Sequence, residues 1–160
     1  MNFQPWLFSP SRVSLLTGRR PDTTRVTDLS AYFRSIGGNF TTIPQFFKEH
    51  GYTSINVGKM FHKQAEGGDD DISWSEVHHG RGAYRGTGAS WEAVDEGLSL
   101  IDTVEADMVM ERLEQLAPAV LSGEETFFMG WGLHRPHLPF LFPKKFGDFY
   151  PAEVDTELPR

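Results

Sequence analysis

The sequence predicts an α/β domain in which helices flank a sheet of parallel type. Three observations support this class. A helical segment with a capping motif runs directly into a short apolar strand, that strand ends at Gly58-Lys59, and a later helical segment is followed by the continuous apolar run Thr126–Trp131. In parallel sheets ligands bind at the carboxyl ends of strands. The residues that follow each strand are therefore the first candidates for function.

Composition excludes several classes of function. With 160 residues, the chain is long enough for one domain with a core. Its net charge of −7 argues against nucleic-acid binding through a basic surface. The absence of any run of about 20 apolar residues argues against a membrane span, and residues 1–8 lack the basic start of a signal peptide. The chain has no cysteine, which excludes disulfides, zinc–thiolate sites and a cysteine nucleophile.

The first expected element is a short helix over residues 10–17. Ser9 is suited to cap it, Pro10 to occupy its first position, and Gly18 to end it. The polar residues 19–28 are expected to form a loop.

The second helix begins at Thr42, which forms a capping box with Gln45. Its apolar face is expected to comprise Ile43, Phe46 and Phe47, and it ends at Gly51. A strand over residues 52–57 follows.

The remaining chain divides into an insertion, a helix, a strand and loops. Residues 63–100 are rich in Gly, Asp and Ser and are expected to form a long surface insertion with little regular structure, in which the acidic run 69–71 is a solvated turn rather than a calcium loop. A helix over 104–116, capped by Thr103 and followed by Pro118, leads to the strand at 126–131. Two strands are too few for a doubly wound sheet, so the chain is expected to be part of a larger domain.

Cationic and imidazole side chains gather at the expected sheet edge although the chain is acidic. They are Arg12, Lys59, His62, His134, Arg135 and His137. Together with a helix N-terminus they predict a site for a small oxyanion such as sulfate, phosphate or carboxylate. Two plainer interpretations stay open, a solvent-facing Arg12 and a structural His62. Pro136 places His134 and His137 in a loop, which does not favour a metal site.

Two stretches resemble the signatures of the sulfatase family. Pro10-Ser11-Arg12-x-x-Leu15-Leu16-Thr17-Gly18 is similar to the first signature, and Gly51-Tyr52-x-Ser54-x-x-Val57-Gly58-Lys59-x-Phe61-His62 to the second. The longer forms GRRPDTTRV, NFTTIPQFFKEHGY, VGKMFH and GLHRPHLPF resemble the iduronate-2-sulfatase branch. The resemblance is close over residues 9–62 and looser over about 101–151.

The resemblance implies an alkaline-phosphatase-like fold and hydrolysis of sulfate esters, with sulfated carbohydrate as the substrate. In this family the nucleophile is a formylglycine, and a calcium ion lies beside it. By the same resemblance Arg12 would steady the formylglycine, Lys59 and His134 would bind the sulfate oxygens, and His62 would contact the formylglycine hydroxyl. Family members are periplasmic or secreted in bacteria and lysosomal in animals, and the sequence does not choose among these locations.

The chain departs from the family pattern at the nucleophile. Phe8 occupies that position, and formylglycine cannot form there. No residues match the family's metal carboxylates, so metal binding is not expected. We interpret residues 1–160 as part of a sulfatase N-terminal domain, with residues 1–8 as an unrelated leader, and expect the chain to be an inactive fragment. The alternatives are a non-catalytic oxyanion-binding module and a phosphoesterase of the same superfamily.

Overall fold

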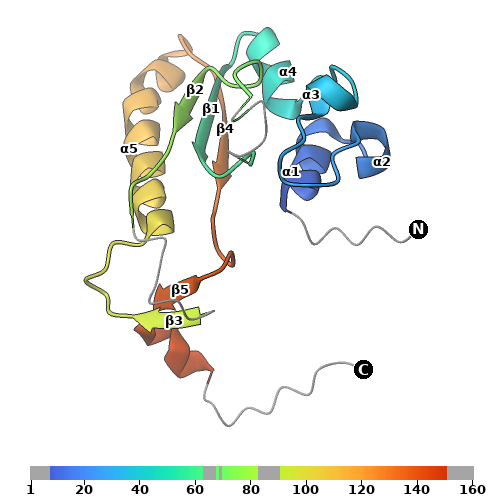
Figure 1. Cartoon of the computed structure of the whole chain (residues 1–160). Helices are drawn as coiled ribbons and strands as arrows, with labels where there is room; N and C mark the ends of the chain where they lie inside the picture. The colour runs from blue at the N-terminus through green and yellow to red at the C-terminus, as the bar shows by residue number, and fades with distance from the viewer. Residues whose placement is uncertain (1–7, 63–67, 69, 83–90, 151–160) are drawn as a thin grey trace.

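The computed structural model describes residues 8–62, 68, 70–82 and 91–150. They form two parallel sheets with helices (Figure 1), which confirms the predicted α/β class. The elements are α1 Phe8–Thr17, α2 Pro21–Thr24, α3 Phe33–Ile36, α4 Ile43–Glu49, β1 Thr53–Gly58, β2 Glu76–His78, β3 Trp91–Val94, α5 Ile101–Ser122, β4 Phe127–Gly132, β5 Phe140–Pro143 and the 3-10 helix Lys144–Phe149. The larger sheet has the order β2-β1-β4, and the smaller one pairs β3 with β5.

Strand β1 is the centre of the larger sheet, and it ends level with β4. The register pairs Val57 with Trp131 and Gly58 with Gly132. The segments that leave both strands therefore begin at the same edge. Figure 1 shows α5 on one face of this sheet and α1 to α4 on the other side.

Helix α5 covers its face of the sheet with an apolar stripe. Val109 and Leu116 pack with Ile55 and Val57 of β1, and all four are nearly inaccessible to solvent. The helix runs well past the expected end at 116 and contains Pro118. Proline removes one helical hydrogen bond, but Pro118 is exposed, so water can solvate the carbonyl it leaves unbonded. The N-cap position of α5 is Leu100 rather than Thr103, and the Leu100 side chain makes no capping hydrogen bond.

The opposite side of the sheet is packed by short helices, and several expectations for them were wrong. Helix α1 begins at Phe8, so Ser9 lies inside it rather than at its cap. Residues 21–24, expected in a loop, form α2, because Pro21 starts a turn that the N–H of left-handed Arg25 closes on the Pro21 carbonyl.

Helix α4 has the predicted capping box between Thr42 and Gln45. Its buried face is not the expected one, since Ile43 and Phe46 are 43% and 51% exposed while Gln45 is buried. The Gln45 side chain faces inward because its Oε1 accepts a hydrogen bond of 2.8 Å from Nη2 of Arg34.

The expected insertion at 63–100 contains regular structure that its composition conceals. Strand β2 pairs in parallel with β1, and β3 pairs with β5. Neither strand has an alternating apolar pattern, and β2 is instead held by Arg112, which donates two hydrogen bonds to the Glu76 carboxylate. Residues 63–67, 69 and 83–90 of this insertion, and 1–7 of the expected leader, lie outside the described residues.

Asp70 was expected in a solvated turn, but it is 1% exposed and lies at the centre of a buried polar network. Arg34 donates to both of its carboxylate oxygens at 2.9 Å, and the Tyr32 hydroxyl donates at 2.6 Å. Burial and the neighbouring Asp70 raise the pKa of Tyr32 above its ordinary value. The network joins α3 to the segment before β2.

We expect Asp70→Asn to lower the free energy of unfolding by about 3–5 kcal/mol, because it leaves the buried Arg34 charge without a counterion. Asp71→Asn, at the exposed neighbouring position, should change it by less than about 0.5 kcal/mol. Urea unfolding followed by circular dichroism measures both. Equal effects of the two substitutions would contradict a structural role for the buried pair.

Candidate active site

The candidate site lies where β1 and β4 end, and Arg12 links the two strand ends. Arg12 projects from α1, and its Nη1 donates to the carbonyl oxygen of Lys59. Its Nη2 donates to the carbonyl oxygen of Leu133 at 3.1 Å. The structure thus brings Arg12 to the backbone of Lys59, with the loop that contains His134 beside them.

Two facing glycines, Gly58 and Gly132, allow the ends of β1 and β4 to come this close. Gly58 has φ of 75°, and a Cβ there would collide with the Gly132 carbonyl oxygen and with Oε2 of Glu105. A Cβ on Gly132 would collide with the backbone of Lys59. The N–H of Lys59 donates to the Gly132 carbonyl at 2.6 Å, which joins the two strands beyond the regular ladder.

Positive charge is concentrated and partly desolvated around Lys59. Burial, and then the charge of Arg12, lower the pKa of the Lys59 ammonium. Burial also lowers the pKa of Arg12. Neighbouring cations repel one another, and a bound anion would offset this repulsion.

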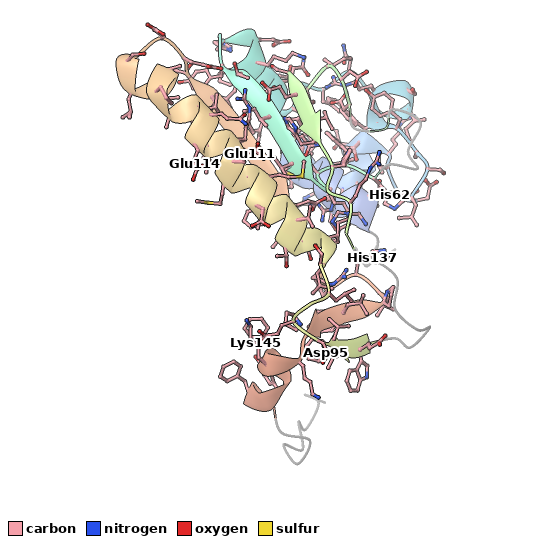
Figure 2. All side chains as sticks on the ribbon, turned by 90° about the vertical axis from the view of Figure 1, so that its left-hand side faces the viewer. His62, Asp95, Glu111, Glu114, His137 and Lys145 are labelled. Carbon is pink, nitrogen blue, oxygen red and sulfur yellow. The ribbon has the colours of Figure 1, made fainter. Side chains whose placement is uncertain are left out.

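His62 belongs to the same cationic group. Its pKa is lowered by burial first, then by the charge of Lys59, with smaller effects in the same direction from His137 and Arg12; the Leu29 backbone opposes them. Figure 2 shows His62 and His137 on the same side of the molecule, near the lower end of the sheet. The sequence placed His137 among the cations of this edge but predicted no role for it. Its position as the second histidine of the H-x-x-H spacing was the signal that could have suggested a role.

His134 lies at the same edge but its Nδ1 faces carboxylates. This atom is 3.4 Å from Oδ1 of Asp102 and 3.2 Å from Oε2 of Glu105. Asp102 also accepts hydrogen bonds from the backbone N–H groups of His134 and Arg135, at 2.7 and 3.1 Å. The sequence indicated neither carboxylate, because Asp102 and Glu105 read as ordinary polar positions of an amphipathic helix.

Comparison with known proteins identifies the family. The family model named Sulfatase matches residues 9–157, so this chain belongs to the sulfatase family. The chain is 39% identical over 167 residues to iduronate 2-sulfatase of Homo sapiens and 38% identical over 172 residues to that of Mus musculus, alignments that cover 94% of this chain and 30% of each relative. It is 29% identical over 173 residues to a sulfatase of Formosa agariphila, covering 92% of this chain and 33% of that protein.

The chain therefore spans about a third of the length of the curated relatives it matches. In the part of the chain that the structure describes, no helix has the length and apolar content needed to cross a membrane.

The two groups that the family implies, a formylglycine and a calcium ion, do not fit the residues here. Phe8 starts α1, one helical turn before Arg12, and its hydrocarbon side chain is no precursor of formylglycine. Within the described residues, the one group of His, Asp and Glu that could hold a metal is Asp102, Glu105 and His134. Calcium takes oxygen ligands, and one of these three donors is an imidazole nitrogen.

Removing the charge of Lys59 should raise the pKa of His62. Lys59→Met abolishes a repulsion that disfavours protonated His62, so the histidine should take up its proton at a higher pH. Titration of the His62 ring resonances by NMR measures this directly. Lys145→Met, which removes an exposed lysine paired with Glu96, is the matched control, and an equal rise in both variants would contradict the proximity of Lys59 and His62.

Proposed function

We propose that this chain provides the sulfate-recognition side of a sulfatase active site. The proposed activity of the complete protein is hydrolysis of sulfate esters on sulfated carbohydrates. The similarity to the human and mouse iduronate 2-sulfatases favours an iduronate 2-sulfate as the substrate. The observation that supports it most is the cationic group at the ends of β1 and β4. Arg12 is fixed there by two carbonyls, and Lys59 and His62 have pKa values lowered by burial and by neighbouring positive charges.

Each residue of the group has a distinct proposed part. Lys59 supplies a point charge to the sulfate oxygens, strengthened because its surroundings are partly desolvated. Both terminal nitrogens of the Arg12 guanidinium donate to carbonyl oxygens, so Arg12 holds the strand ends together and adds a fixed positive charge. His62 has a lowered pKa, which favours its neutral form, so it can accept a proton when an anion binds. His134 would offer its second ring nitrogen to a sulfate oxygen, because its Nδ1 faces carboxylates.

We propose that this chain does not itself turn over sulfate esters, because Phe8 occupies the position of the nucleophile. A sulfatase needs a nucleophile at this position, and a phenyl ring has none. A purely anion-binding role is the second candidate function, and Phe8 is the observation that favours it. The two candidates share the same anion site and differ in whether a nucleophile reaches the bound sulfate.

Inorganic sulfate should bind this chain, and binding should tighten as pH falls. A bound dianion favours protonated His62, so affinity increases as pH decreases through the pKa of that histidine. Lys59→Met should weaken sulfate binding about tenfold or more, the value of a charge-assisted hydrogen bond. Isothermal titration calorimetry measures both effects.

Lys145→Met serves again as the control and should bind sulfate like the parent chain. Sulfate binding that is absent, or that Lys59→Met leaves unchanged, would contradict the proposed site. Tighter binding of phosphate than of sulfate would favour a phosphoesterase-like site.

The segment after Phe8 should still serve as a substrate for formylglycine formation, because Pro10 and Arg12 of the first signature are retained. We expect Phe8→Cys, produced together with a formylglycine-generating enzyme, to carry an aldehyde at that position. Mass spectrometry of the peptide detects it. The double variant Phe8→Cys with Arg12→Ala should be converted less; failure of the single variant would show that the motif is no longer functional.

A further inference from the structure

Helix α5 and the loop after β4 bring two carboxylates and an imidazole together behind the cationic group. Asp102 and Glu105 are three residues apart on α5, so they face the same direction. One ligand atom from each of Asp102, Glu105 and His134 lies within 4.8 Å of the other two. The side chain of Glu105 is completely buried, and those of Asp102 and His134 are only 17% and 13% exposed.

Hydrogen bonds hold both carboxylates but leave one Glu105 oxygen without a donor. The backbone N–H groups of His134 and Arg135 anchor Asp102, and the N–H of Gly80 donates to Oε1 of Glu105 at 3.3 Å. Oε2 of Glu105 accepts no hydrogen bond from the described residues, although it is inaccessible to solvent and lies 3.2 Å from the His134 ring. A buried carboxylate oxygen in this position is costly unless another group compensates it.

Two carboxyl groups face one imidazole in this group. A divalent cation bound to both carboxylates and to a neutral imidazole would make the group neutral. It would also give the buried Oε2 of Glu105 a partner.

The two separations from the His134 ring match the edges of a metal tetrahedron, and the two carboxylates lie within 4.8 Å of each other. Metal–nitrogen and metal–oxygen bonds of about 2.0–2.1 Å place two tetrahedral ligands about 3.3 Å apart. Nδ1 of His134 lies 3.4 Å from Asp102 and 3.2 Å from Glu105. The hydrogen bonds to Asp102 and Glu105 correspond to the outer contacts that usually orient metal ligands.

We propose that Asp102, Glu105 and His134 bind a divalent transition-metal ion of the Zn²⁺ class, with a fourth position open to water. Mixed nitrogen and oxygen donors suit such ions, whereas Mg²⁺ and Ca²⁺ favour oxygen alone. The ion joins the N-terminal turn of α5 to the loop that carries His134 and His137. This inference does not rest on the proposed sulfate binding: the two sites share His134, but the metal would take its Nδ1 and the sulfate its other ring nitrogen.

The test is titration of the full chain, freed of metal, with ZnCl₂ and with CoCl₂. We expect one Zn²⁺ per chain by calorimetry and visible absorption bands of tetrahedral Co²⁺. At a Zn²⁺ concentration about 100-fold above Kd, the melting temperature should rise by about 5–10 °C. CaCl₂ and MgCl₂ at the same concentration should produce a much smaller shift.

Glu105→Gln and His134→Gln should each weaken Zn²⁺ binding at least tenfold. The matched control is Glu114→Gln, the same change at an exposed position further along α5 (Figure 2), which should bind Zn²⁺ like the parent chain. Circular dichroism establishes whether each variant is folded.

The unsubstituted chain gives a second readout if a variant does not fold. In histidine NMR spectra Zn²⁺ should shift the ring nitrogens of His134, while those of His62 and His137 stay nearly unchanged. Absence of Zn²⁺ and Co²⁺ binding would overturn the proposal. So would shifts centred on His62 and His137, or binding that Glu105→Gln leaves intact.

Discussion

The hydrogen bonds from Arg12 to the carbonyls of Lys59 and Leu133 are the interaction on which the rest of the site depends. Val13 and Leu16 of α1 also pack in an apolar cluster with Phe61 and Trp74, and such packing is not directional. The two carbonyls point the helix at the strand ends. The hydrogen bonds also hold the positive charge of Arg12 in a partly buried place, where a charge is costly. Burial is the main cause of the lowered pKa values of Lys59 and His62, and the charge of Arg12 adds to it in both cases.

The same edge of the sheet holds both signs of charge, and the backbone separates them. Cations from α1 and from the segment after β1 gather as one group, while Asp102 and Glu105 of α5 turn to His134. Gly58 lies between the two groups, since it contacts the Glu105 carboxylate region and is followed directly by Lys59. Asp102 and Glu105 are thus engaged with the backbone and ring of the His134 segment and with the Gly80 N–H, on the other side of Gly58 from Lys59.

The sequence predicted what local chemistry determines. The capping box of α4, the strand that ends at Gly58 and Lys59, and the apolar strand expected at 126–131 and found at 127–132 were all confirmed, because each depends on neighbouring residues. Strand β2 could not be predicted, since it is short and polar and becomes a strand only by pairing with β1. Burial of Asp70 depends on Arg34, 36 residues away, and the carboxylates facing His134 lie 29 or more residues before it. Distant partners of this kind leave no local pattern.

The position of Arg12 also has a consequence for how the protein is made. Its two hydrogen-bond partners are 47 and 121 residues further along the chain. As the chain emerges from the ribosome, α1 can therefore meet the end of β1 early, but the second contact must wait until β4 has been synthesised. Contacts between residues so distant in sequence slow folding. The contact between α1 and the end of β4 can therefore be completed only after both β1 and β4 have been made.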